Sequence, residues 1–586
     1  MSNISNLIKE NIKKAVKSLY EIDIEDIHLE HPENENFGDY ASSVSLSLAK
    51  NIKRIPLEIA SELSHEIQSY KLEFESDGTH YPIFLTIEAV QPGFINFKLS
   101  TEWLKQQLTE VIEQDGKYGS SDVGKDKTII VEFSQPNPNK PMHIGHSRNN
   151  FIGSSLSAIF SFSGYNVIKM NYMDDWGTHV CKSMLMYKKH GNNEEPSIKT
   201  DHYVGDLYIM YEKDHEANPE GLEKELADLF QKLERHDSET LELWKKIVNW
   251  AYKGWESTYQ NENVSFDVWT YQSDHTKGGK EIVDLAVKKG VAEKDSTGAI
   301  IARLEKYGIP DKVLLRSDGT SIYITQDTQL AKENYETYKF DKRFYVVDCR
   351  QSGYFVQLFK ILDLLGFEWA KNLYHISYGT VSLPEGAMSS RLGNVVNADD
   401  VYKKLVDIEE DEARNSLKDT TNLQETAKKV ALAAYRYGML KVDSKQDIVF
   451  DYSKVTKFEG NTGPYLMYSY ARAKSLLEKA GVGENKLDFN LELFGEIKLE
   501  EKELNILRSV YKFPEIVLES ANNFMPHVIA NYLYDLAQRF NSFYADVPVL
   551  NAQEHTKEFR LALVKCFSQI MKNGLSLLGI DVVEKM

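Results

Sequence analysis

The sequence has no long hydrophobic run. No apolar stretch approaches the roughly 18 residues that a membrane-spanning helix needs. The opening MSNISNLIKENIKKAV mixes charges with aliphatic side chains, where a signal peptide would have an apolar core. We therefore expect a cytoplasmic protein with no membrane partner.

Cysteine is scarce as well. Cys181, Cys349 and Cys566 are far apart in the sequence and form no CxxC pair. This spacing excludes a disulfide framework and gives no sign of a cysteine zinc site. We predict buried free thiols and no structural zinc.

Positive charge is in deficit, because 69 Lys and Arg oppose 88 Asp and Glu, giving a formal net charge of −19. This balance excludes a basic coat for non-specific nucleic-acid binding but permits a local RNA site. Residues 451–586 are nearly balanced, with 16 Lys and Arg against 18 Asp and Glu. A partner that bears phosphates is best tolerated there.

The 586 residues, 42% apolar and 27% charged, indicate an α/β multidomain globular protein. Residues 1–117 combine amphipathic helices with the alternating strands FLTIEAV and FINFKLS, which predicts a small N-terminal α/β domain. YGSSDVGKDK, at 118–127, has the composition of a linker. From 401 to 586 strand signals fade and amphipathic helices succeed one another, which predicts a C-terminal all-α helical bundle.

Residues 118–400 are expected to form a Rossmann-like parallel-sheet domain. TIIVEF predicts a strand, a helix follows from about His143 to a cap at Gly164, and YNVIKMNYM predicts the next strand. Such a βαβ unit binds ligands at the carboxyl ends of its strands. Helices at about 186–262, with Trp244, Trp250 and Trp255 in a core, form an insertion. TSIYITQD, RFYVVD and LYHISYGTVSL are then expected to resume the sheet, alternating with a helix in YFVQLFKILDLLG.

The loop SQPNPNKPMHIGHSRNNFIG, Ser134 to Gly153, joins the first strand to that helix. His143 and His146 have three interpretations: zinc ligands completed by His179 and Cys181, simple helix caps, or donors to a phosphate at a helix N-terminus. We favour phosphate chemistry, because a strand precedes, a helix follows and no His-Glu zinc pattern accompanies the pair. Gly145, which has no Cβ, would allow a nucleotide to approach the backbone closely.

HIGH after a first strand resembles the adenylate-binding motif of class I aminoacyl-tRNA synthetases, and VEFSQPNPNKPMHIGHSRNNFIG resembles its arginyl-tRNA synthetase version. NYMDDWGTHV, SDGTSIYITQD, YVVDCRQSGYFVQLF and GAMSSRLGNVV follow in that family's order. NFGDYASSVSLSLAK and PGFINFKLS resemble its N-terminal RNA-binding domain, and FEGNTGPYLMYSYAR its helical anticodon-binding domain. The resemblance covers the whole chain.

The resemblance implies a catalytic domain that activates L-arginine with ATP, accompanied by Mg²⁺, and transfers it from an arginyl-adenylate to the tRNA for arginine. It also implies release of pyrophosphate and AMP, and a monomer. His143 and His146 would stabilise charge on the phosphates, Gly145 would line the ATP site, and Asn137 would hold the arginine backbone.

AMSSR, Ala387 to Arg391, stands in place of the second class I motif, commonly KMSKS, but lacks both lysines. In the resembled family a lysine before the first motif often supplies the missing charge, and Lys140 is in that position. Arg391 is a second candidate for this charge. Three residues of AMSSR are assigned to ATP binding by the resemblance: Met388, Ser389 and Ser390.

Matching positions assign Tyr323 and Asp327 to the arginine guanidinium and Gln351 to the backbone end of the substrate. Gln272 stands where a pocket glutamate is usual, which puts arginine affinity in doubt more than reaction type; Asp274 is a candidate to compensate. Four further departures replace the usual glycine, glutamine, arginine and histidine: Asp174, His179, Gln326 and Tyr354.

For tRNA binding, the aromatic and cationic side chains of Tyr465, Tyr468 and Arg472, at the start of the tail, are expected to contact unpaired bases. Helical spacing indicates that some of the aromatic residues there, Tyr470 included, are instead buried in the core.

Two alternative functions remain. A related nucleotidyltransferase would adenylate a small molecule and need neither the tail nor the N-terminal domain. A non-catalytic tRNA-binding relative would explain the unusual pocket residues.

Overall fold

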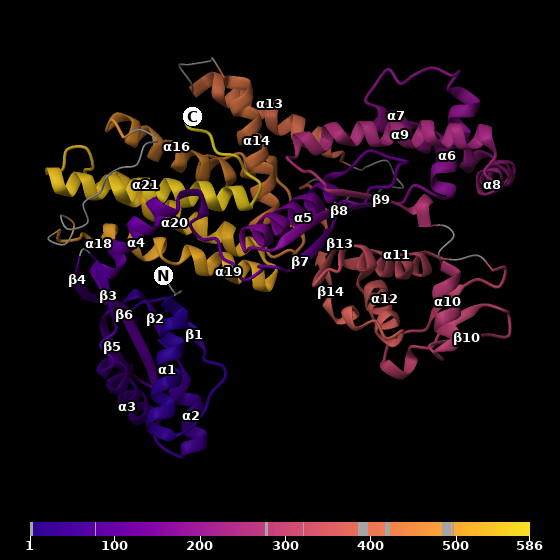
Figure 1. Cartoon of the computed structure of the whole chain (residues 1–586). Coiled ribbons are helices and arrows are strands. Elements are labelled where there is room, and N and C mark those ends of the chain that lie inside the picture. The colour runs from indigo at the N-terminus through magenta and orange to yellow at the C-terminus, as the bar shows by residue number, and fades with distance from the viewer. Residues whose placement is uncertain are drawn as a thin grey trace.

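The computed structural model describes residues 4–76, 78–275, 279–319, 322–384, 396–416, 422–482, 494 and 497–586. In Figure 1 the N-terminal domain projects from one end of a helical C-terminal region, and a parallel sheet with its helices extends to the other end. No helix of the described part of the chain is long and apolar enough to cross a membrane.

The N-terminal domain is built on an antiparallel sheet of order β1-β2-β6-β5, which confirms FLTIEAV and FINFKLS as strands. Its strands are β1 (Leu29–Glu30), β2 (Tyr40–Ser42), β5 (Phe84–Val90) and β6 (Phe94–Leu99). The domain also contains the hairpin of β3 (Glu73–Ser76) and β4 (Thr79–Pro82), and the helices α1 (Ile4–Tyr20), α2 (Val44–Ile52), α3 (Pro56–Ser69) and α4 (Thr101–Gln114).

The central sheet has the order β14-β13-β7-β8-β9, and every neighbouring pair is parallel. Its strands are β7 (Thr128–Glu132), β8 (Asn166–Met173), β9 (Val268–Tyr271), β13 (Lys342–Asp348) and β14 (Leu373–Tyr378). α5 (Ile144–Phe162) follows β7 and α12 (Ser352–Leu364) follows β13. β7 is flanked by β8 on one side and β13 on the other, so chain connections leave it in both directions. Ligands bind at such a switch point, beyond the carboxyl ends of the strands.

One predicted strand is wrong. TSIYITQD was expected in the sheet, but Tyr323 begins α11 (Tyr323–Tyr338). The run is rich in β-branched residues, yet β propensity is a weak preference that tertiary packing overrides. Here Ile324 and Thr328, one helical turn apart, are both buried, and Thr328 donates its hydroxyl to the Ile324 carbonyl. RFYVVD and LYHISY are confirmed as β13 and β14.

The insertion between β8 and β9 is helical and begins earlier in the sequence than expected, at Thr178. Its helices are α6 (Thr178–His190), α7 (Thr200–Ala217), α8 (Pro219–Glu234) and α9 (Ser238–Asn261). Trp250 and Trp255 are buried, and Trp244 donates its indole N–H to the Asp175 carbonyl. Between β9 and α11 lie α10 (Gly279–Lys288) and a small antiparallel sheet of β10 (Ala292–Lys294), β11 (Ile300–Ala302) and β12 (Lys312–Leu315).

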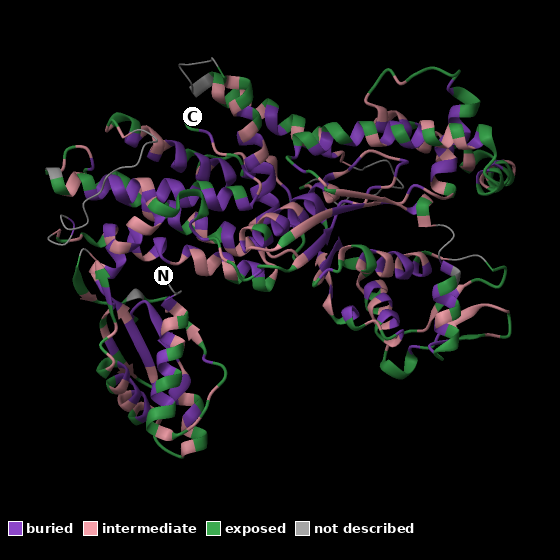
Figure 2. Ribbon diagram, in the orientation of Figure 1, coloured by how far each residue is buried: buried purple, intermediate pink, exposed green. Residues whose placement is uncertain are grey.

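The C-terminal region is helical, as predicted. Its elements are α13 (Ala398–Ser416), α14 (Leu423–Leu440), α15 (Tyr452–Val455), α16 (Gly463–Lys479), α18 (Glu501–Val510), α19 (Phe513–Asn523), α20 (Pro526–Asp546) and α21 (Glu554–Leu577). A two-stranded ladder of β15 (Val381–Ser382) and β16 (Ile448–Val449) ties it to the sheet domain. Buried residues line the inner faces of α14, α20 and α21 (Figure 2).

Two further expectations need correction. Cys181 and Cys566 are buried, but Cys349 is exposed, because it lies in a short 3-10 turn (Cys349–Gln351) after β13. The 118–127 segment is irregular, yet it is not a free linker. Tyr118 is 2% exposed, donates its hydroxyl to the Val510 carbonyl and packs on the Phe513 ring. The N-terminal and sheet domains are therefore both held against α18 and α19.

Candidate active site

The loop after β7 turns sharply at the carboxyl edge of the sheet. Ser134 and Gln135 have φ of 81° and 48°, a left-handed conformation that costs free energy for residues other than glycine. Two buried amides hold it: the Ser134 N–H donates to Asn149 Oδ1 (2.7 Å) and the Gln135 N–H to Asn171 Oδ1 (3.0 Å). The sequence analysis missed both asparagines. Asn149 lies in a run of polar residues at the start of α5, and Asn171 lies between apolar residues near the end of β8.

His143 and His146 start α5 with a reciprocal pair of caps. The Gly145 N–H donates to His143 Nδ1 (3.1 Å), and the His143 N–H donates to His146 Nδ1 (3.0 Å). A nitrogen that accepts from a backbone N–H carries no proton, so each neutral ring must carry its proton on Nε2. The two rings lie together, with centroids 3.8 Å apart. The caps therefore leave two neighbouring N–H donors at a helix N-terminus.

Burial keeps both imidazoles neutral. It lowers the pKa of His143 to about 4, with the positive charge of Lys140 as a further cause. Burial, together with His143 and Lys140, lowers the pKa of His146 well below its usual value. Burial also lowers the pKa of the Lys140 ammonium. Near neutral pH the pair can thus donate hydrogen bonds to an anion without changing protonation.

The backbone just beyond the second motif lies against the first. The Ile144 N–H donates to the Val396 carbonyl (3.1 Å) and the Ala398 N–H to the Met142 carbonyl (2.9 Å). Four residues assigned to the second motif lie outside the described residues: Met388, Ser389, Ser390 and Arg391. The chain that resumes at Val396 is therefore anchored on the histidine loop.

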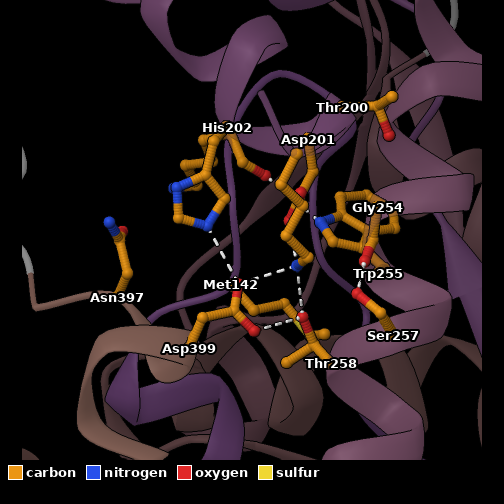
Figure 3. A network of polar contacts seen from close by, with 12 residues as sticks. Met142, Thr200, Asp201, His202, Gly254, Trp255, Ser257, Thr258, Asn397 and Asp399 are labelled. Atoms are coloured by element: carbon orange, nitrogen blue, oxygen red, sulfur yellow. Dashed lines mark hydrogen bonds and ion pairs between the residues drawn. The ribbon is translucent and has the colours of Figure 1, made fainter. Parts of the chain in front are cut away.

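A polar network fixes the start of α13 to the insertion. The Asp399 carboxylate accepts from Lys199 Nζ (2.7 Å), His202 Nε2 (2.9 Å) and Thr258 Oγ1 (2.9 Å), as Figure 3 shows. Burial opposes ionisation of Asp399, but His202 and Lys199 outweigh it and lower its pKa to about 2. Asp201, His202 and Asp399 form the single group in the described ranges whose atoms cluster like metal ligands. The Lys199 ammonium already pairs with both carboxylates, at 3.1 and 2.7 Å.

A second set of side chains surrounds Asp327 at the same edge of the sheet. Asp327 and Tyr323 are four residues apart in α11 and so lie on one side of the helix. Tyr354, from α12, donates its hydroxyl to Asp327 Oδ2. Burial, opposed by that hydrogen bond and reinforced by Glu132, raises the pKa of Asp327 to about 7. The Glu132 carboxylate is itself ion-paired with buried Arg343.

Gln272 joins this set from the end of β9. Its side-chain amide lies between the Asp174 carboxylate and the Trp176 carbonyl on one side and the Gln326 amide on the other. The orientation that satisfies these groups directs the nitrogen at Asp174 Oδ1 and at the Trp176 carbonyl, 3.1 Å away. Asp274, the expected compensating carboxylate, is exposed.

Asn137 and Gln351 complete the edge. Asn137 is partly buried in the loop, and its carbonyl accepts from the Asn139 N–H (2.7 Å). Gln351 is exposed at the end of the turn after β13. Next to it, Arg350 pairs through two nitrogens with Asp348, at 2.8 and 2.9 Å. The structure thus brings all of the described residues predicted for ATP and arginine to the ends of β7, β9 and β13 and to the start of α11.

An aromatic surface lies apart from this edge in the chain, on α16 and α20 of the C-terminal region. The Arg472 guanidinium is stacked between the rings of Tyr468 (4.6 Å) and Tyr544 (4.9 Å). Both tyrosines are exposed, as is Phe458 beside Tyr468. Tyr465 is partly buried and accepts a hydrogen bond from Asn541, while Tyr470 is buried. Neither Tyr544 nor Phe458 was predicted: Tyr544 is distant in sequence, and Phe458, although it begins the FEGNTGPYLMYSYAR motif, was not singled out.

Three family models together match most of the chain. They are the class I (R) tRNA synthetase catalytic domain at residues 107–452, the arginyl-tRNA synthetase N-terminal domain at 6–99 and the DALR anticodon-binding domain at 466–586. The chain belongs to the arginyl-tRNA synthetases. The catalytic model contains every residue of the edge described above, and Tyr468, Arg472 and Tyr544 fall within the anticodon-binding model.

Relatives of known name support this family membership over the full length. The chain is 35% identical to an arginine–tRNA ligase of Porphyromonas gingivalis and 37% identical to one of Borrelia hermsii, each pair matching over 100% of both chains. The solved arginyl-tRNA synthetase of Thermus thermophilus has a TM-score of 0.85 at 26% identity, over 100% of both chains. That of Plasmodium falciparum, at 21% identity and a TM-score of 0.81, shares the fold.

Proposed function

We propose that this arginyl-tRNA synthetase ligates L-arginine to its tRNA at the carboxyl edge of the central sheet. The observation that carries the proposal is the juxtaposition there of two neutral imidazole donors at a helix N-terminus and a buried carboxylate site. The first suits a phosphoryl group in a transition state, and the second suits a guanidinium. Neither site alone would account for the reaction.

In the first step the arginine carboxylate attacks the α-phosphorus of ATP, which enters as its Mg²⁺ complex, and the bond to pyrophosphate breaks. The Nε2–H groups of His143 and His146 donate to phosphate oxygens as negative charge builds on them. Lys140 and Arg391 supply positive charge to the triphosphate, while Gly145, Met388, Ser389 and Ser390 contact the nucleotide. In the second step a hydroxyl of the terminal tRNA ribose attacks the arginyl carbonyl, and AMP leaves.

The amino acid is held at both of its ends. The Asp327 carboxylate pairs with the guanidinium, and Tyr323 and Gln272 line the same end of the pocket. Asn137 and Gln351 hold the amino and carboxylate groups beside the histidine loop. A fixed position for the attacking carboxylate is the main requirement of such phosphate chemistry.

The tRNA would be read by the aromatic surface of the helical region. Bases of an unpaired anticodon stack on Tyr468 and Tyr465, with Arg472 beside them. Exposed aromatic rings around a guanidinium favour this assignment. We further propose that the enzyme acts in the cytoplasm as a monomer.

Pyrophosphate exchange tests the proposal directly. The full-length protein is incubated with each of the twenty amino acids, with and without tRNA, and exchange into ATP is measured. Exchange is expected with arginine alone among the amino acids. Exchange with no tRNA-charging activity would favour an amino-acid adenylating enzyme instead, and no exchange under either condition would favour a non-catalytic tRNA-binding relative.

A further inference from the structure

Asp174 and Gln272 occupy equivalent positions at the ends of two adjacent parallel strands. Met173 of β8 and Tyr271 of β9 form the last pair of the ladder; Asp174 follows Met173, and Gln272 begins the 3-10 turn Gln272–His275. The two side chains meet there, because the Gln272 amide lies against Asp174 Oδ1. A carboxylate can therefore reach the same space from either strand end.

The amide of Gln272 is engaged with the Asp174 carboxylate and does not replace it. In the orientation that directs its nitrogen at Asp174 Oδ1, its oxygen faces the side chain of Gln326, one residue before Asp327 in α11. Gln272 is 4% exposed, and the neighbouring acceptors, Asp174 Oδ1 and the Trp176 carbonyl, favour this orientation of its amide. The Gln272 side chain therefore lies between Asp174 and the part of α11 that carries Asp327.

Both carboxylates lack a strong cationic partner. Within the described residues, no lysine or arginine nitrogen lies within 4.0 Å of Asp174 or Asp327, and the nearest basic group to Asp174 is His179 Nε2 at 3.9 Å. That nitrogen is already hydrogen-bonded to the Asp174 carbonyl at 2.8 Å. Arg343, near Asp327, is paired with Glu132 and stacked on Tyr345.

Burial raises the pKa of both carboxyl groups, and the charge of Asp174 adds to the shift at Asp327. Two partly buried carboxylates that repel one another lower the stability of the free protein. A cation bound between the two carboxylates would offset that repulsion. A planar guanidinium, with five N–H donors in a fixed fork, can satisfy both at once.

We propose that Asp174 is the second anionic group of the arginine pocket, a specificity-determining residue that Gln272 orients by donating to its carboxylate. The guanidinium would then lie between Asp174 and Asp327. This inference rests on the proposed function and deepens it, because it names the feature of the amino acid that the pocket selects. Two carboxylates favour a planar cation over L-citrulline, which has nearly the same shape and no charge.

The test compares Asp174→Asn with the double variant Asp174→Asn/Gln272→Glu in the full-length protein. Loss of one charge-assisted interaction should raise the arginine KM in tRNA charging by roughly 10- to 100-fold. kcat, the ATP KM and the melting temperature should remain close to wild type. The double variant returns a carboxylate to the same space from β9, so it should regain most of the arginine affinity.

Asp274→Asn is the matched control, since it removes an exposed carboxylate two residues from Gln272 and should leave the arginine KM unchanged. Calorimetric binding of L-arginine and L-citrulline provides a readout independent of catalysis, and Asp174→Asn should reduce the preference for arginine. An unchanged arginine affinity, or an equal rise in the ATP KM together with a lower melting temperature, would overturn the inference. Wild-type protein that binds arginine but charges no tRNA would defeat the proposed function alone.

Discussion

The nucleotide half and the amino-acid half of the site are built in opposite ways. The described part of the nucleotide half is one contiguous loop, Ser134 to His146, held by hydrogen bonds from backbone N–H groups to side chains, and burial keeps its two imidazole rings neutral. The amino-acid half is assembled from the ends of β8 and β9 and from α11 and α12, and it consists of carboxyl groups whose pKa burial raises.

This difference has a functional consequence. Neutral donors on a rigid loop act on developing charge and should affect kcat with little dependence on pH near neutrality. Carboxylates that bind the substrate cation should affect the arginine KM. This effect should depend strongly on pH, because the carboxyl groups must be ionised to bind arginine. The two halves should therefore respond separately to mutation.

The largest effect is expected for His146→Ala. Removing one transition-state donor should lower kcat by roughly 10²- to 10³-fold, with only a modest change in the ATP KM. The substitution also removes the acceptor for the His143 N–H, a cap worth about 1 kcal/mol. A melting curve therefore accompanies the charging assay. A change confined to the ATP KM would contradict the assigned role.

Lys140→Met should slow the activation step by roughly 10- to 100-fold, because a buried ammonium opposite the triphosphate is lost. The Lys140 carbonyl, which accepts from the Trp255 indole N–H, is retained. Single-turnover adenylate formation measures the effect, with Lys125→Met as an exposed-lysine control. An unaffected rate would indicate that Arg391, and not Lys140, supplies the positive charge that the AMSSR motif lacks.

The pH dependence of the arginine KM separates the two halves without mutation. In the free protein the pKa of Asp327 is raised to about 7. Below that pH the carboxyl group is protonated, and a guanidinium, which stays charged, must displace the proton. The arginine KM should therefore rise about tenfold per pH unit as the pH falls below 7, and become flat above it.

Several charged or titratable groups lie near Asp327, and a change in any of them would also shift the pH profile. They are Tyr354, Glu132, Arg343, Asp174, Tyr172 and Tyr323. Asp327→Asn should flatten the profile and raise the arginine KM at all pH values. The ATP KM should be nearly constant from pH 6 to 8, because the pKa of His143 is only about 4. A parallel rise in both KM values would show that the halves are not independent.

The contrast also explains which parts of the site were predictable. His143, Gly145 and His146 are adjacent in sequence, so local capping rules and a strand-loop-helix pattern were sufficient to place them. The partnership of Asp174 with Gln272 depends on the register of β8 against β9, which the sequence does not encode locally. For the same reason Asp274 looked like the nearest carboxylate, although it faces solvent.

The fold shows the same limit. Amphipathic periodicity predicted α16, α18, α20 and α21, because one stripe of each helix faces a core. It failed for TSIYITQD, where β-branched residues begin α11. The position of Tyr118 was likewise set by a contact with a distant segment, the Val510 carbonyl. Local sequence patterns predicted the structure correctly where that structure did not depend on which other segment packs against it.

The smallest effect is expected outside both halves, at the aromatic surface. Arg472→Met removes the cation between Tyr468 and Tyr544 but leaves the rings in place, so the tRNA KM should rise by roughly tenfold or less. Lys479→Met removes an exposed charge further along α16 and is the matched control. Steady-state charging with varied tRNA measures the effect. The arginine KM should not change, since the amino-acid half contains no residue of the helical region. A rise in the arginine KM would mean that the anticodon surface and the amino-acid pocket are coupled.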